Sequence, residues 1–237
     1  MTTRMREIFR PPQRSDPVPP RPASVVHPAE APLDCPLCPR LVAYRHDNAA
    51  AHPDWFNAPV PSFGDEAAQL LIVGLAPGVQ GANRTGRPFT GDYAGDLLYG
   101  TLLEFGFAKG TYQARPDDGL KLTGAMITNA VRCVPPQNKP TPAEAKTCRR
   151  FLEARMAALP NLRAVLALGR IAHDAVLSAR AVRKTSAPFA HGATHDIGEG
   201  LRLFDSYHCS RYNTNTRRLT PEMFQDVFSA VKTWLDS

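Results

Sequence analysis

Short apolar runs recur along the chain from residue 70 onward, at residues 70–73, 125–128, 165–168 and 201–204. These runs are mostly apolar instead of alternating strictly between apolar and polar positions. Runs of this kind, about four to eight residues long, are typical of strands that are buried on both faces of a sheet. We therefore predict one strand at each of the four runs.

Segments with helical spacing lie between these runs, and two of them have clear start signals. In the first, Thr141 supplies an N-cap, Pro142 a first-turn proline and Glu144 a capping-box glutamate. Thr220 and Pro221 repeat the cap and the proline. Because strands and helices alternate, the pattern predicts a mainly parallel sheet that is covered by helices on both faces and connected by right-handed crossovers.

The first 32 residues have a different composition. They contain eight of the 23 prolines and five arginines, with few large apolar side chains. Such a segment cannot bury enough surface to offset the entropy that ordering costs. We predict a disordered, Pro- and Arg-rich tail over residues 1–32 and a single domain over residues 33–237.

Composition narrows the class of protein. Hydrophobic residues make up 43% of the 237 residues, which is too many for a wholly disordered chain. The sequence contains neither a long apolar stretch nor the apolar region of a secretory signal, so we expect a cytoplasmic protein with no membrane contact. The formal net charge of +6 suits a polyanionic partner without proving one.

Four of the five cysteines form a candidate metal site. Cys35 and Cys38 are separated by two residues, Cys133 and Cys148 follow much later, and Cys209 stands apart. Because cytosolic thiols stay reduced, a metal is favoured over disulfides. Zinc and an iron–sulfur cluster both accept four thiolates, although the irregular second pair favours a cluster. Four buried cysteines without a metal remain an alternative.

The residues after the predicted strands carry the candidate chemistry, because ligands of such sheets bind beyond the carboxyl ends of the strands. Residues 74–91 include five glycines and two prolines but match neither common nucleotide fingerprint. Phe89 in this loop offers either a face for base stacking or a core contact. Asn129 presents a donor and an acceptor to a planar partner, and His208 offers a donor to a developing anion.

Three segments, residues 74–92, 129–136 and 208–216, together with the four cysteines resemble family 5 uracil-DNA glycosylases, which are relatives of the iron–sulfur family 4 enzymes. The resemblance covers about Leu33 to the C-terminus. It implies an α/β fold, a three-layer α/β/α sandwich with a central, mainly parallel four-stranded sheet. It also implies a DNA base-excision repair enzyme that hydrolyses the N-glycosidic bond of uracil, and of other deaminated or modified bases, after the nucleotide has flipped out of DNA.

The resemblance also implies a role for individual residues. Phe89 would stack on the extruded base, Asn129 would read its Watson–Crick edge, and His208 would hydrogen-bond a carbonyl oxygen that gains charge as the bond breaks. The remaining base-binding residues would be Gly74, Ala76 and Gly78. The ligands of a [4Fe–4S] cluster would be Cys35, Cys38, Cys133 and Cys148.

Leu75 departs from the pattern of related families, which place Asp, Asn or Glu after the first glycine to position the attacking water. An aliphatic side chain cannot do this. Asp92 is the nearest carboxylate in the loop, so we expect it to orient water or to stabilise the cationic sugar. The three segments contain no lysine, which predicts a monofunctional glycosylase that leaves an abasic site.

DNA that contains uracil is the expected partner of a monomeric protein, with double-stranded DNA foremost and single-stranded DNA as well. The candidate DNA contacts are Arg84, Arg87, Arg132, Ser210, Arg211, Tyr212 and Asn213. Two other functions remain open. One is a zinc-stabilised nucleic-acid-binding module without catalysis, and the other is an α/β enzyme that acts on free nucleotides.

Overall fold

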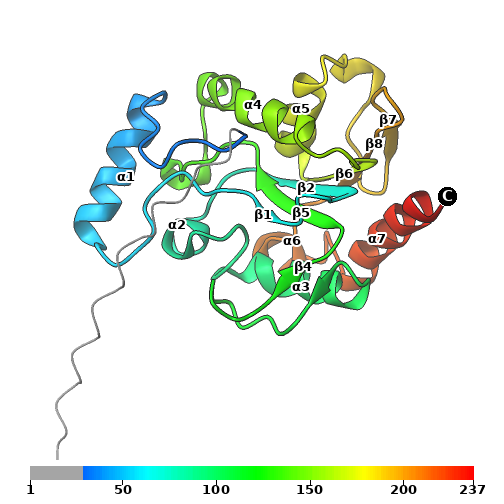
Figure 1. Ribbon diagram of the computed structural model, residues 1–237, viewed down its shortest axis with the longest axis horizontal. Coiled ribbons are helices and arrows are strands. Elements are labelled where there is room, and N and C mark those ends of the chain that lie inside the picture. The colour runs from blue at the N-terminus through cyan, green and yellow to red at the C-terminus, as the bar shows by residue number, and fades with distance from the viewer. Residues whose placement is uncertain (1–28) are drawn as a thin grey trace, which may run out of the picture.

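A computed structural model describes residues 29–237, which fold around one central sheet (Figure 1). The six strands of this sheet follow the order β1-β5-β2-β6-β8-β7. A separate two-stranded sheet pairs β3 with β4. The strands are β1 (Phe63–Gly64), β2 (Leu70–Gly74), β3 (Ala108–Lys109), β4 (Lys121–Leu122), β5 (Ala125–Asn129), β6 (Ala164–Leu168), β7 (Thr194–Asp196) and β8 (Arg202–Ser206).

The four predicted strands form the parallel centre of the sheet, where β5, β2, β6 and β8 pair in turn. The prediction of a mainly parallel sheet is confirmed, but the expected number of four strands is wrong. Strands β1 and β7 add antiparallel edges. They are only two and three residues long and contain no apolar run, so the hydrophobic pattern could not indicate them.

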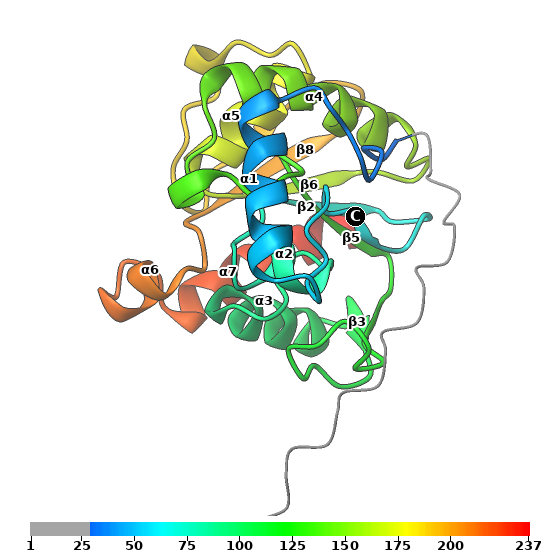
Figure 2. The same cartoon turned by 90° about the vertical axis from the view of Figure 1, so that its left-hand side faces the viewer.

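Helices cover both faces of the sheet, which confirms the three-layer α/β/α architecture (Figures 1 and 2). Helices α3 and α7 lie on one face, whereas α4 and α5 lie on the other. The α-helices are α1 (Pro39–Ala51), α2 (Ala82–Thr85), α3 (Tyr93–Glu104), α4 (Pro142–Ala157), α5 (Arg170–Ala179), α6 (Arg211–Asn215) and α7 (Pro221–Asp236). Two 3-10 turns, η1 (Pro136–Asn138) and η2 (Lys184–Ser186), complete the elements. None of the helices in the described part of the chain combines the length and the apolarity that crossing a membrane requires.

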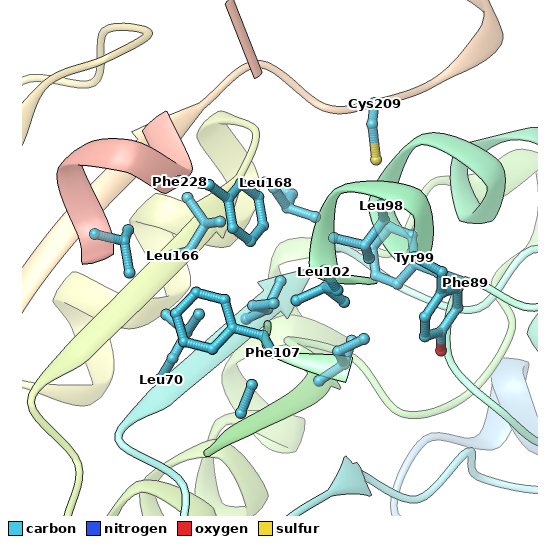
Figure 3. Packing of buried hydrophobic residues seen from close by; sticks show 14 of the residues in the cluster. Leu70, Phe89, Leu98, Tyr99, Leu102, Phe107, Leu166, Leu168, Cys209 and Phe228 are labelled. Atoms are coloured by element: carbon cyan, nitrogen blue, oxygen red, sulfur yellow. The ribbon is translucent and has the colours of Figure 1, made fainter. Parts of the chain in front are cut away.

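Alternate residues of each central strand point into the two cores. Leu70 and Ile72 of β2 join the cluster beneath α3 and α7, which Figure 3 shows from close by. Leu71 and Val73 join the cluster beneath α4 and α5. Side chains alternate along a strand, and both faces of this sheet are covered, so most positions of the central strands are apolar.

The two predicted helix starts are present. The Thr141 hydroxyl accepts a hydrogen bond from the Glu144 amide at 3.2 Å, and the Glu144 carboxylate accepts one from the Thr141 amide at 2.7 Å. This reciprocal pair is the predicted capping box of α4. At α7, the Thr220 hydroxyl accepts from the Met223 amide at 3.2 Å.

The end of the predicted tail belongs to the folded domain. Most of that segment, residues 1–28, lies outside the described residues. Glu30, however, is buried, and its carboxylate lies 2.6 Å from Arg155 and 3.1 Å from Arg132. It also accepts a hydrogen bond from the Ser62 amide. The predicted boundary at residue 32 is therefore too late, because a proline-rich composition does not reveal a single glutamate that pairs with buried arginines.

Candidate active site

One cavity of about 260 Å³ lies beyond the carboxyl ends of the central strands. β2 ends at Gly74, β5 ends at Asn129, and His208 follows the end of β8 by two residues. The cavity brings together Phe89, Asp92, Asn129 and His208, which are the four side chains that we expected to act on the base or on the sugar. Its lining residues are Leu75, Ala76, Pro77, Gly78, Ala82, Phe89, Asp92, Ala94, Asn129, Asn138, His208 and Ser210.

Phe89 and His208 place two rings on the wall of this cavity. Their ring centroids lie 5.8 Å apart with an angle of 27° between the planes. Gly74 backs the Phe89 ring, although it does not line the cavity. A Cβ atom at Gly74 would lie 2.6 Å from the Phe89 Cζ and 2.5 Å from the Asn129 Oδ1, so only glycine leaves room for both groups.

Asn129 and His208 both keep their polar side-chain atoms available. No hydrogen bond joins the Asn129 carboxamide or the His208 ring to another side chain or backbone group among residues 29–237. Burial lowers the pKa of His208 to about 4, so the ring is neutral at pH 7. Asn213 fixes the backbone beneath this ring by donating from its Nδ2 to the His208 carbonyl at 2.8 Å.

Asp92 supplies the carboxylate of the cavity, at the N-cap of α3. Burial raises the pKa of Asp92, while the backbone amides of Gly95 and Ala94 act in the opposite direction. Its Oδ1 atom is buried and has no hydrogen-bond partner within the described part of the chain. A Cβ atom at Gly81 would overlap the Asp92 carboxylate, which explains why the loop needs glycine there. An acceptor left in this state is suited to hold a water molecule.

Asn138 is a lining residue that the sequence analysis missed. It closes the η1 turn together with Gln137, and both residues have left-handed backbone, with φ values of 56° and 57°. Two consecutive non-glycine residues in this region store strain, which is common at ligand sites. The two prolines that precede them were the signal available in the sequence, but a proline pair indicates a turn without showing where the turn points.

The loop after His208 is built around α6. The Ser210 hydroxyl accepts a hydrogen bond from the Asn213 amide and caps the helix, so Ser210 and Asn213 support the loop. Tyr212 is 72% exposed, and the Arg211 guanidinium lies 5.2 Å from the centroid of the Tyr93 ring. Arg84, on α2, is also exposed. Arg84, Arg211 and Tyr212 are therefore free to contact a partner.

Arg87 and Arg132 lie inside the protein and do not form the surface contacts that we expected. Arg87 makes two hydrogen bonds to Asp118, at 2.7 and 2.8 Å, and is 4% exposed. Arg132 is 1% exposed and pairs with Glu30. A guanidinium that is already paired and buried cannot reach a DNA phosphate, and sequence alone does not distinguish such an arginine from an exposed one.

The four candidate metal ligands line a second, small cavity. Cys35 and Cys38 enter it from the start of α1, Cys133 from the segment after β5, and Cys148 from α4. All five cysteines are free thiols, and Cys209 is buried elsewhere, with its Sγ near the Ala94 carbonyl. The backbone amide of Arg132 donates to the Cys148 Sγ at 3.3 Å, as amides do toward metal-bound thiolates.

Burial and one nearby arginine act on these thiols in opposite directions. Burial raises the pKa of Cys133 to about 12 and that of Cys148 to about 11, so both thiols stay protonated at pH 7 until a metal displaces the protons. The buried Arg45 donates to the carbonyls of Leu33 and Cys35, which places a positive charge beside the site. Four cysteines around one cavity are the kind of donor set that an iron–sulfur cluster requires.

The fold and the pocket together define a class of enzyme. The family model of the uracil DNA glycosylase superfamily matches residues 61–232, and the chain belongs to this superfamily.

Relatives place the chain more narrowly. It is 48% identical over 204 residues to the type-5 uracil-DNA glycosylase of Thermus thermophilus, and the match covers 84% of this chain and 92% of that protein. It is 42% identical over 206 residues to the type-5 enzyme of Mycobacterium tuberculosis, and the match covers 84% of this chain and 77% of that enzyme. A type-4 enzyme of Archaeoglobus fulgidus is more distant, at 30% identity over 154 residues, and the match covers 63% of this chain and 69% of that enzyme. The protein is thus a member of the type-5 group.

Proposed function

We propose that this protein removes uracil from DNA by hydrolysing the N-glycosidic bond, which releases the free base and leaves an abasic site. The observation that carries this proposal is the single cavity shared by Phe89, Asn129, His208 and Asp92. Each residue would contribute a different function, and together they would bind the base, recognise its edge and support cleavage of its glycosidic bond. The names of the type-5 relatives support the same conclusion.

Base recognition would rest on Asn129 and Phe89. The Asn129 carboxamide offers one donor and one acceptor, which match the edge of uracil. The Phe89 ring would stack on the base, a contact worth about 1 to 3 kcal/mol. Because Gly74 lets both groups share one wall, a planar base could meet them at the same time.

The chemical step would be supported from two sides. As the bond breaks, negative charge develops on the base and positive charge on the sugar. The neutral His208 ring would donate a hydrogen bond to the base oxygen that gains charge. The Asp92 carboxylate, with its unpaired Oδ1, would hold the attacking water or stabilise the cationic sugar. No lysine among residues 29–237 lines the cavity, so a Schiff base and strand cleavage are not expected.

The DNA would have to present the nucleotide outside the helix. Flipping costs a few kcal/mol and is easiest at a mismatch such as U·G. The exposed Tyr212 would fill the gap, and the exposed Arg84 and Arg211 would contact phosphates. We propose that a monomer acts on duplex DNA and on single-stranded DNA in the cytoplasm.

We also propose that Cys35, Cys38, Cys133 and Cys148 hold a [4Fe–4S] cluster. Support comes from the four free thiols around one cavity and from the adjacent Arg45 and Arg132. When bound, the cluster would link the start of α1 to β5 and α4 without taking part in hydrolysis. Iron and sulfide analysis of protein purified without oxygen tests this, and one zinc per chain without iron would contradict it.

The decisive experiment incubates the purified protein with duplexes that carry one U·G, U·A or hypoxanthine site and then treats them with alkali. We expect cleavage at the uracil only after alkali, because the enzyme would leave an intact abasic strand. Cleavage without alkali would contradict the monofunctional mechanism. Binding without any base release would instead favour the non-catalytic nucleic-acid-binding module.

A further inference from the structure

Phe89 holds an unusual backbone conformation. Its φ is 54°, in the left-handed region that bulky side chains rarely adopt. Such strain persists only where the surrounding structure holds the residue in place. The ring that lines the cavity therefore depends on contacts outside the cavity.

Two tyrosine hydroxyls hold the peptide groups on either side of Phe89. The Tyr99 hydroxyl donates to the Pro88 carbonyl at 2.6 Å, and the Tyr112 hydroxyl donates to the Phe89 carbonyl at 3.2 Å. These two carbonyls belong to the peptide planes before and after the Phe89 Cα, so fixing both planes fixes its φ and ψ. Figure 3 shows Tyr99 next to Phe89 at the edge of the core.

Buried contacts fix the two tyrosines in turn. Their rings stack with centroids 4.6 Å apart, and the Arg87 guanidinium lies 5.2 Å from the Tyr99 centroid and 5.7 Å from the Tyr112 centroid. Arg87 is held by Asp118 and also donates from its Nε to the Thr90 hydroxyl at 2.7 Å. Burial raises the pKa of Tyr112 to about 12, so its hydroxyl keeps its proton at pH 7.

Helix α3 approaches this arrangement through a glycine. A Cβ atom at Gly95 would overlap the Phe89 carbonyl and the Tyr112 hydroxyl. The small residue therefore lets the tyrosine reach the strained peptide group. Backbone strain, two hydroxyl donors, a buried ion pair and a glycine contact all converge on one residue.

We propose that Tyr99 and Tyr112 are positioning residues that hold the Phe89 ring in its stacking position before the base arrives. This inference rests on the proposed excision of uracil for its kinetic consequence, but its structural part does not. Without the hydroxyls, the left-handed strain at Phe89 would be released and the ring would leave the cavity wall. The flipped base would then enter a pocket in which one wall must be ordered during binding.

Tyr112→Phe and Tyr99→Phe test the proposal, because each removes one oxygen and keeps the ring. With saturating enzyme and a U·G duplex, we expect the single-turnover rate to fall about tenfold in each variant, since small displacements in an active site carry costs of this order. The dissociation constant for uracil-free duplex should not change. Tyr44→Phe, which removes a hydroxyl from α1, is the matched control and should match the wild type.

A double-mutant cycle separates positioning from general destabilisation. If the hydroxyls act through the Phe89 ring, Tyr112→Phe should cause no further loss in a Phe89→Ala background. An equal loss in that background, or no loss in the single variants, would overturn the proposal.

A crystal structure of Tyr112→Phe gives a readout that needs no activity. We expect residue 89 to leave the left-handed region in this variant, and an unchanged φ would overturn the proposal. If the wild type released no uracil, the proposed function would fail, while this structural result would still decide the role of the tyrosines.

Discussion

The base cavity and the cysteine cavity lie at the two ends of one short segment, yet the contacts of their polar groups differ. Asn129 ends β5 and belongs to the first cavity, whereas Cys133, four residues later, belongs to the second. In the base cavity, the Asn129 carboxamide, the His208 ring and the Asp92 Oδ1 lack protein partners among the described residues. Beside the cysteines, the Nη atoms of Arg45 and Arg132 are held by carbonyls and by a carboxylate, while the Nε atom of each is buried without a partner in the described part of the chain.

This difference separates a site for a substrate from a site that holds the fold. Unpaired polar groups are costly to bury, so a protein keeps them where a substrate or water will satisfy them. Around the cysteines, the Nη atoms of Arg45 and Arg132 instead bind carbonyls and a carboxylate of other segments and hold those segments in place. Substitutions in the base cavity should therefore lower the rate, while substitutions in the cysteine cavity should lower stability.

The largest effect is expected from His208→Ala. Loss of a donor to a developing anion costs about 10²- to 10³-fold, so the single-turnover rate of uracil release should fall by that factor. Duplex binding and the melting temperature should stay close to the wild type. His46→Ala, on the exposed side of α1, serves as the control, and a wild-type rate in His208→Ala would contradict the assignment.

Asp92→Asn should give the next largest effect. The variant keeps the shape of the side chain but removes its charge, and we expect a fall of about 10²-fold in the single-turnover rate. Asp96→Asn, one turn further along α3, is the matched control because its carboxylate is exposed. Equal rates for the two variants would show that the charge of Asp92 has no special role.

The pH dependence should be smaller, about tenfold per pH unit on the acid side. The pKa of His208 is lowered to about 4, so the ring stays neutral through the neutral range. The pKa of Asp92 is raised, so this carboxylate gains a proton at a higher pH than an ordinary Asp does. The rate should therefore be flat around pH 7 and decrease as the pH falls toward 4. A decrease as the pH rises through about 6.5 would instead indicate a protonated, catalytic His208.

The smallest effect on the rate is expected from Cys133→Ser. The variant should yield less soluble protein and lose the visible absorbance of the proposed cluster, but each folded molecule should release uracil within about twofold of the wild-type rate. Cys209→Ser, outside the cysteine cavity, should keep the absorbance. A large loss of rate in soluble Cys133→Ser protein would remove the distinction between the two cavities.

Much of this structure could be predicted from the sequence, because the local sequence signals agree with the burial of the residues that carry them. The apolar runs located the four parallel strands, and the Thr-Pro signals located two helix starts. The edge strands β1 and β7 could not be predicted, because their pairing depends on the neighbouring strands β5 and β8 and not on their own two or three residues. Phe89, Asn129, His208 and Asp92 do share one cavity, while their chemical roles stay predictions.

Charged residues were the weakest part of the prediction. Arg87 and Arg132 stand in segments rich in site residues, but their partners, Asp118 and Glu30, are 31 and 102 positions away. No local pattern reveals an ion pair of that separation. Asn138 was missed for a related reason, since the direction of a turn depends on the packing around it.

Glu30 sets a limit on how far the protein can be shortened. A protein that starts at Leu33, where composition alone would place the start of the domain, would leave Arg132 and Arg155 without the carboxylate that both of them contact. Removing one partner of a buried ion pair costs about 3 to 5 kcal/mol. Cleavage of the chain between Glu30 and Leu33 should therefore weaken the β5–α4 side of the molecule.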